Sequence, residues 1–300
     1  MPVFKSRITT SSDSFRANRE AMLSLIDKLR GLEQRAVDAS NRRRATFEAR
    51  GQIPPHERVA RLLDPGMPFL RLHTLSNYLL EDSDPETSIP GGSVILGIGF
   101  VSGVRCMVWA DDSGIRAGAA TRGGWLAALN VQEMAMRLKL PFVHLVESAG
   151  ANLMAYEVEL WADGGKLFRN LARLSARGIP TMVVLHGPST AGGAYMPGMS
   201  DYVIGVKNNG LAALGGAALV KAATGEVADE RELGGTEMHA ATTGLVEYLA
   251  DDDSHGIAIA RDVLGRLGWN NRAELAARGE VIPPVYDPDE IAGVVPVDYT

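Results

Sequence analysis

The chain has 300 residues and a formal net charge of −6, so it can bury a sizeable core, and its acidic balance argues against a nucleic-acid partner. Its single cysteine, Cys106, lies in an apolar run, and the sequence shows no disulfide framework and no metal-ligand spacing, which is typical of a reducing compartment. It also shows no apolar run of membrane-spanning length and no signal-peptide-like stretch at the N-terminus. We therefore expect a cytoplasmic protein, or one of the mitochondrial matrix if its source is eukaryotic, without metal, membrane or nucleic-acid partners.

The N-terminal part of the chain, residues 1–56, is predicted to be a helical extension. Residues 14–50 have helical spacing and follow a run of capping residues. The helix carries a group of basic side chains: Arg35, Arg42, Arg43, Arg44 and Arg50. A solvated helical face explains such a group, and contact with the phosphates of a ligand is the alternative.

The middle of the chain alternates between strand and helix patterns. After a short helix at 57–63, residues 93–100 and 104–110 form a predicted hairpin. A loop that contains Arg116 and Gly118 follows the hairpin. An amphipathic helix is predicted at 126–137.

Two strands then each run into a turn of small residues. The first strand, 141–148, leads into Ala149-Gly150-Ala151, and the second, 181–185, leads through a polar turn into Ala191-Gly192-Gly193-Ala194 and Tyr195. Residues 164–177 between them have helical spacing. A right-handed crossover of this kind places both turns at the same edge of a parallel sheet.

Such turns can bind a ligand through their backbone N–H groups. Where a Gly-Gly pair enters a short helix, the free N–H groups of the first turn face outward and can hold an oxygen that gains negative charge. The structural alternative is a tight strand–helix junction whose glycines only permit close packing.

The remaining sequence offers weaker signals. Residues 212–216 and 242–246 are predicted short strands, and 219–224 and 251–267 are predicted helices. Lys221 suits a ligand contact and an exposed helix position equally. His239 is interpreted as a structural residue, because the sequence assigns it no carboxylate or hydroxyl partner. The Pro-rich tail from residue 281 is predicted to be extended.

Several segments of the sequence resemble those of a known family. They occur in the same order and cover nearly the full length of the chain. They are ERVARLLDPGMPFL (57–70), IPGGSVILGIGFVSGVRCMVWADDS (89–113), QEMAMRLKLPFVHLVESAGANL (132–153), HGPSTAGGAYMPGMSDYVI (186–204), LVKAATGE (219–226), ELGGTEMH (232–239) and YDPDEIAGVVP (286–296). The chain resembles the N-terminal half of the carboxyltransferase (beta) subunit of biotin-dependent acyl-CoA carboxylases, close to the methylcrotonyl-CoA and geranyl-CoA branch.

This resemblance implies a fold and an organisation. The fold is α/β, a crotonase/ClpP-like arrangement of ββα units with an N-terminal helical extension. The implied domains are the extension at 1–56, a carboxyltransferase N-terminal domain at 57–270, and a linker or tail at 271–300 towards a second half.

The resemblance also implies an activity, in which CO2 passes from carboxybiotin to an acyl-CoA through a thioester enolate. The carboxybiotin is carried by a biotin carboxylase or biotin carrier partner, and a homo-oligomer is expected. Backbone oxyanion donors are expected at Gly192, Gly193, Gly150 and Ala151. Substrate or CoA contacts are expected at Ala149, Ala191, Ala194, Tyr195, Arg116, Gly118 and Lys221.

Departures from the family pattern leave alternatives open. Gln52 stands where relatives commonly have lysine, and the loop from Arg116 to Trp125 has a different sequence from that of relatives. Met196 occupies the position of one hydratase glutamate, and no carboxylate stands around residues 214–216 where the second would lie, so hydration is not expected. A stand-alone CoA-thioester decarboxylase or isomerase, or a non-catalytic CoA-binding domain, are the other hypotheses.

Overall fold

The computed structural model describes residues 5–150, 157–269 and 283–297. The backbone divides into two compact units, one of residues 1–34 with 273–300 and one of residues 35–272. The helix α1 (Asp13–Asn41) crosses the boundary between the two units. No helix in the described part of the chain is long and apolar enough to cross a membrane.

The smaller unit joins the two ends of the chain. The Asn18 side-chain amide donates hydrogen bonds to the backbone carbonyls of Gly293 and Val295. Residues 288–294 form a short 3-10 helix, η6 (Pro288–Glu290), followed by α11 (Ile291–Val294), so the prediction of an extended tail is wrong there. The helix starts because Asp287 caps it and Pro288 stands at its first position.

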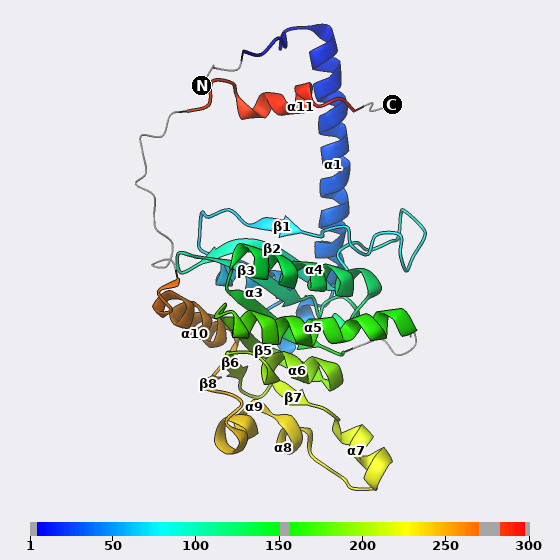
Figure 1. Ribbon diagram of the computed structural model, residues 1–300. Coiled ribbons are helices and arrows are strands. Elements are labelled where there is room, and N and C mark those ends of the chain that lie inside the picture. Colours follow the sequence, from blue (N-terminus) through cyan, green and yellow to red (C-terminus); the bar gives the residue numbers. More distant parts are fainter. Residues whose placement is uncertain (1–4, 151–156, 270–282, 298–300) are drawn as a thin grey trace. The chain divides into compact units, whose positions relative to one another are not determined.

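The larger unit is built on one mixed sheet in the strand order β1-β2-β3-β4-β5-β6-β8, with β7 paired to β5 (Figure 1). The strands are β1 (Leu70–Leu72), β2 (Val94–Val101), β3 (Val104–Asp111), β4 (Phe142–Ser148), β5 (Thr181–Thr190), β6 (Tyr202–Val206), β7 (Leu211–Ala213) and β8 (Tyr248–Ala250). The first three strands are antiparallel and the others pair in parallel. The central strand β4 is buried along almost its whole length, as a parallel strand covered on both faces must be.

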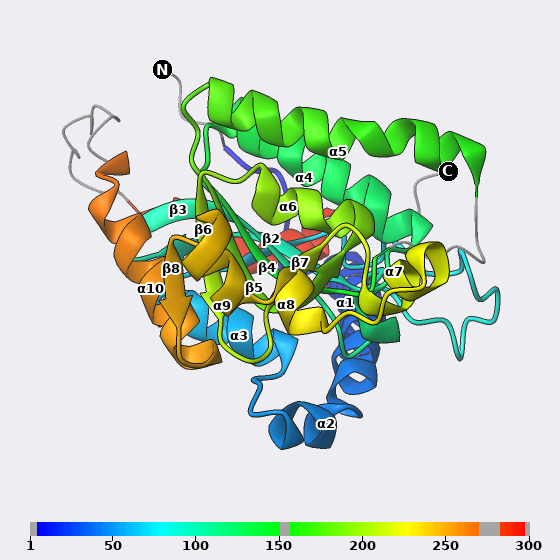
Figure 2. The same cartoon turned by 90° about the horizontal axis from the view of Figure 1, so that it is seen from below.

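Helices cover both faces of this sheet. The helices of the larger unit after α1 are α2 (Arg44–Ala49), α3 (Pro55–Leu62), η1 (Arg116–Gly118), α4 (Arg122–Leu138), α5 (Val158–Ala176), η3 (Ala191–Ala194), α6 (Tyr195–Gly198), α7 (Ala217–Thr224), α8 (Glu230–Gly234), α9 (Thr236–Met238), the π-helix η4 (His239–Thr243) and α10 (Asp253–Arg266). Figure 2 shows α4 and α5 on one side of the sheet and α3 and α10 on the other. Each side has its own apolar core, one that includes Val146, Leu171 and Leu185 and one that includes Leu62, Val184 and Leu264.

Three other predicted elements differ from the structure. The polar turn expected at 186–190 is the second half of β5. The helix expected at 14–50 is broken near Arg42 and Arg43, so that α1 and α2 are separate. The strand expected at 242–246 is replaced by the end of η4, and the strand of this region is β8, further along the chain. Gly244 has a φ of 73°, and this left-handed residue ends the helical turn inside the range where a strand was expected.

Candidate active site

The two turns of small residues lie side by side, as the crossover pattern predicts. β4 and β5 are parallel neighbours, and Ser148 at the end of β4 pairs with Ser189 near the end of β5. Gly150 is so close to β5 that a Cβ added to it would lie 3.5 Å from the Thr190 carbonyl oxygen. Both turns line one pocket of about 450 Å³ between the sheet and helices α4 and α5.

The wall of this pocket is largely aromatic. Among the described residues, its lining includes the rings of Trp109, Trp125, Trp161, Phe168 and Tyr195. Phe168 and Tyr195 pack together with their ring centroids 4.8 Å apart. Small residues make room between the rings, since a Cβ on Gly164 would lie only 2.4 Å from the Trp125 ring. The pocket therefore suits an apolar group brought close to backbone.

The second turn presents backbone to the pocket. Ala191 has a φ of 52° and begins the short helix η3, whose first residues include Gly192 and Gly193. The Gly192 N–H, in the first turn of η3, has no acceptor within that helix and donates to no side chain among the described residues. The hydroxyl of Ser189 holds the turn by donating to the Gly193 carbonyl over 2.8 Å.

The first turn is tied to the loop that follows β3. The Ala149 N–H donates to the Ala117 carbonyl over 3.0 Å, and the Ala120 N–H donates to the Gly150 carbonyl over 2.9 Å. The Gly150 N–H donates to the Ser148 hydroxyl over 3.1 Å, and that hydroxyl donates to the Gly118 carbonyl over 2.7 Å. The amides of Ala149 and Gly150 are thus already engaged, whereas the Gly192 amide of the second turn donates to no side chain among the described residues.

Most of the expected site residues line this pocket, and the others lie elsewhere. Ala149, Gly150, Gly118, Ala191, Gly192, Gly193 and Tyr195 line the pocket, while Ala194 is not among its lining residues. Lys221 is exposed on α7 and away from the pocket lining. Ala151 lies outside the described residues.

Arg116 lines a different cavity. Its guanidinium forms an ion pair with Glu81, and it lines a second cavity of about 260 Å³ together with Arg42 and Arg43. Gly92 borders both cavities, so the two adjoin. Other members of the basic group are structural: Arg35, for example, donates to the carbonyls of Pro85 and Ser88.

His239 has the structural role that the sequence analysis favours. One ring nitrogen lies 2.8 Å from the Thr243 hydroxyl and the other 2.8 Å from the Ala212 carbonyl oxygen. The hydroxyl partner that the sequence could not assign is therefore one helical turn away.

Sequence reasoning missed a polar pair in the pocket wall. His144 lines the pocket, stacks on Trp109 at a centroid distance of 4.0 Å, and has Nε2 3.3 Å from Asp111 Oδ2. Asp111 also accepts hydrogen bonds from the Trp109 indole and from the Glu147 N–H. Alternation in the two strands could have indicated that these side chains share a face.

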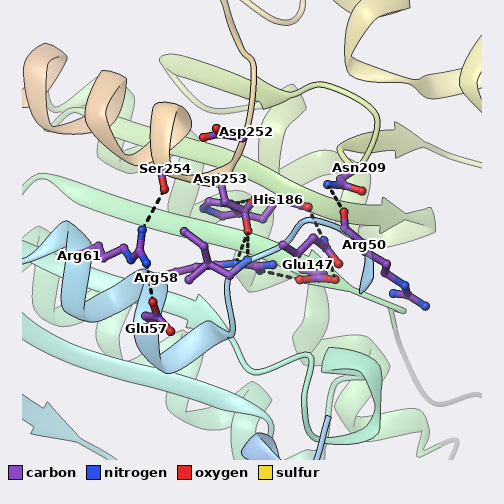
Figure 3. Close-up of polar contacts among 12 residues, drawn as sticks. Arg50, Glu57, Arg58, Arg61, Glu147, His186, Asn209, Asp252, Asp253 and Ser254 are labelled. Carbon is purple, nitrogen blue, oxygen red and sulfur yellow. Dashed lines mark hydrogen bonds and ion pairs between the residues drawn. The ribbon is translucent and has the colours of Figure 1, made fainter. Parts of the chain in front are cut away.

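The sequence pattern also did not indicate a buried charge cluster around Glu147 and His186 (Figure 3). We call Gln52, Arg58, Glu147, His186 and Asp253 the buried cluster; all five are at least nine-tenths buried. Arg58 donates to Glu147 over 2.5 Å and to Asp253 over 3.1 Å. His186 Nδ1 lies 2.7 Å from Asp253 Oδ1.

The environment of the cluster sets its protonation. Burial, followed by the nearby Arg58 guanidinium, lowers the pKa of His186, so the imidazole is neutral near pH 7 and donates Nδ1–H to Asp253. Burial opposes ionisation of Asp253, yet its pKa is lowered on balance by His186, Arg58 and the Ile53 N–H, so this carboxylate is charged. The sequence gives only the hint of polar residues inside apolar strands.

Comparison with known proteins places the chain in a family. The Carboxyl transferase domain profile matches residues 47–300. The chain is 42% identical over 250 residues to a probable biotin-dependent acyl-coenzyme A carboxylase beta2 subunit of Mycobacterium tuberculosis, covering 83% of this chain and 46% of the relative. It is 35% identical to the mitochondrial methylcrotonoyl-CoA carboxylase beta chain of Arabidopsis thaliana, covering 97% of this chain and 50% of the relative.

A solved structure agrees with the sequence comparisons. The beta subunit of geranyl-CoA carboxylase from P. aeruginosa superposes with a TM-score of 0.88 at 44% identity, covering 99% of this chain and 55% of that one. This likeness confirms the crotonase-like carboxyltransferase fold expected from the sequence. The chain spans about half the length of the curated relatives that it matches. It belongs to the carboxyl transferase domain family.

Proposed function

We propose that this chain binds the acyl-CoA in a biotin-dependent acyl-CoA carboxylase and stabilises the thioester enolate that accepts CO2. The observation that carries the proposal is the second turn, whose Gly192 and Gly193 line a pocket at the carboxyl ends of parallel strands. Its position beside a cavity large enough for an acyl group is what a backbone oxyanion site requires.

The chemistry divides between the chain and its partner. Carboxybiotin, delivered by a biotin-carrying partner, supplies both the CO2 and the base for the acyl-CoA proton. The amides of the second turn hold the thioester oxygen as it gains charge, and the loss of one such donor typically costs about 2.7–4 kcal/mol in the transition state. Met196 lines the pocket where a hydratase would have a glutamate, so no side-chain base stands at that position.

The first turn contributes shape. With its Ala149 and Gly150 amides engaged, it holds the loop of Gly118 against the pocket and forms the facing wall. A donor from Gly150 would require release of its bond to Ser148.

The pocket wall indicates the acyl group. Aromatic side chains and small glycines favour an apolar, branched or unsaturated chain over a charged one. Two similar proteins, methylcrotonoyl-CoA carboxylase and geranyl-CoA carboxylase, are named after acyl groups that are apolar, branched and unsaturated.

The adjoining cavity suits the polar part of CoA. Arg42 and Arg43 line it, and guanidinium groups bind phosphates well. Arg116 contributes less charge there because Glu81 neutralises it. The exposed position of Lys221 favours its interpretation as an ordinary helix lysine.

Assembly with other subunits is part of the proposal. Large apolar side chains stand exposed around α7, namely Leu214, Leu219 and Val227. Such a group is typical of surfaces covered by another chain. A second copy of the protein and a biotin-carrying subunit are the partners that we propose.

The function can be tested with the assembled protein and a panel of apolar acyl-CoA thioesters, with and without carboxybiotin. We expect carboxylated product only when both substrates are present, and loss of turnover in Gly193→Val with the fold retained. Release of CO2 from a carboxyacyl-CoA without biotin would indicate a decarboxylase instead. Thermal stabilisation by CoA without any turnover would indicate a binding domain.

A further inference from the structure

The parallel pairing of β4 and β5 changes register just before the two turns. Val146 pairs with Leu185, but Ser148 pairs with Ser189, so β5 advances four residues while β4 advances two. This irregularity decides which residue of the second turn faces the first. The relative position of the two turns therefore depends on what holds the extra residues of β5 in place.

The side chain of Glu147 fills this irregularity. A Cβ added to Gly187 would lie 2.4 Å from Glu147 Cγ, so the carboxylate chain packs directly on the glycine backbone of β5. Glu147 points away from the pocket face, since its neighbours Val146 and Ser148 line the pocket and successive side chains of a strand alternate. The cluster and the pocket thus lie on opposite faces of the same strand ends.

Gln52 joins the two strands at this point. Its amide nitrogen donates to Glu147 Oε1 over 3.2 Å and to the His186 carbonyl oxygen over 2.8 Å. One acceptor belongs to β4 and the other to β5. A two-donor side chain at position 52 therefore clamps both strands immediately below the turns.

Arg58 and Asp253 anchor this clamp to the helices. Arg58, from α3, bonds to Glu147 on one side and to Asp253 on the other. Asp253, at the first position of α10, contacts His186 of β5 and accepts the Ile53 N–H. The hydrogen bonds of the cluster form a closed ring, and its members come from two helices, two strands and a loop.

We propose that the buried cluster is a positioning device for the active site: Gln52 and Glu147 set the register of β5 on β4 and so place the second turn relative to the first. This inference rests on the proposed function, because it assigns these residues a role in the enolate step. A cluster that only stabilises the fold would change the melting temperature without a specific effect on turnover.

The test compares two substitutions of one residue in the assembled protein. Gln52→Met keeps the length of the side chain and removes both donors, whereas Gln52→Lys keeps donors for the same two acceptors. Leu264→Ala is the control, because it removes a buried apolar side chain on the far part of α10 and lowers stability without touching the cluster.

We expect Gln52→Met to lower kcat by about 10- to 100-fold, since a misplacement of about 1 Å can cost that much. The KM for the acyl-CoA should change by less than about two-fold, because the donors act mainly on the transition state. Gln52→Lys should keep kcat within about three-fold of the wild type. Leu264→Ala, assayed well below its melting temperature, should keep kcat near the wild-type value.

A wild-type kcat in Gln52→Met, or an equal fall in Leu264→Ala at a matched loss of stability, would overturn the inference. Crystal structures of the wild type and Gln52→Met give a readout that does not depend on turnover. An unchanged Ser148–Ser189 pairing in that variant would refute the positioning role even if the wild type proved inactive. Absence of acyl-CoA turnover in the wild type would instead reject the proposed function.

Discussion

Replacement of Arg58 by methionine is the sharpest test of the buried cluster as a structural element. Arg58 is 1% exposed and is the cation between two buried carboxylates, Glu147 and Asp253. Methionine fills much of the same volume, so the change removes charge and hydrogen bonds more than it removes packing. It leaves two negative charges close together in a site with almost no solvent.

The expected cost follows from this burial. Removal of one partner from a buried ion pair typically destabilises a protein by about 3–5 kcal/mol, because the remaining charge stays desolvated and unpaired. In a folded unit of this size each kcal/mol lowers the melting temperature by about 2–4 °C, so we expect a fall of about 6–20 °C.

Arg61 provides a matched control on the same helix. It pairs with Glu57, but its side chain is 48% exposed. Such an exposed pair is worth less than about 1 kcal/mol. Arg61→Met should therefore change the melting temperature by only a few degrees.

The assay is thermal unfolding of both variants and the wild type at pH 8 and pH 5. Acidification protonates the orphaned carboxylates of Arg58→Met and relieves their repulsion, so its deficit against the wild type should narrow at pH 5. A fall in melting temperature in Arg58→Met no larger than that in Arg61→Met would refute the reasoning. So would a deficit of Arg58→Met against the wild type that is equal at pH 8 and pH 5.

Three further outcomes follow from the described residues. The pKa of His186 is lowered below its ordinary 6.5, so at a pH below about 6.5 the unfolded state binds more protons than the folded state. The melting temperature should therefore fall as the pH drops below about 6.5. The fall should be less steep in His186→Gln. Gly164→Ala places a methyl group 2.4 Å from the Trp125 ring and should narrow the pocket, so turnover should fall more for long acyl-CoA thioesters than for short ones; an unchanged preference would contradict the assigned pocket. Burial raises the pKa of the Cys106 thiol, and the native protein should therefore resist a thiol reagent that modifies it fully in urea.

The sequence alone predicted the elements nearest the candidate site. Continuous apolar runs marked β4 and β5, and helical spacing marked the segment between them, so the parallel pairing and the adjacency of the turns followed from the handedness of such crossovers. Ordered words of sequence also indicated the family. These features depend on residues close together in the chain, where periodicity and turn chemistry are strong signals.

Other features of the site depended on the tertiary structure. Arg116 and Lys221 were expected at the ligand, but Arg116 turns to Glu81 and Lys221 stands exposed on α7. Gly150 was expected to offer its N–H, yet that amide is bonded to Ser148. Local spacing could not show these outcomes, because each depends on which neighbour packs against the residue.

The buried cluster shows the physical limit most clearly. Its members stand at positions 52, 58, 147, 186 and 253, and nothing in the spacing of these residues relates them. A buried charge is tolerated only where a partner of opposite charge or a hydrogen-bonding group meets it, and that meeting is decided by the packing of α3 and α10 on the sheet. Hydrophobic periodicity therefore determined the strands and helices of this protein, whereas the pairing of its buried polar groups was decided by the three-dimensional fold.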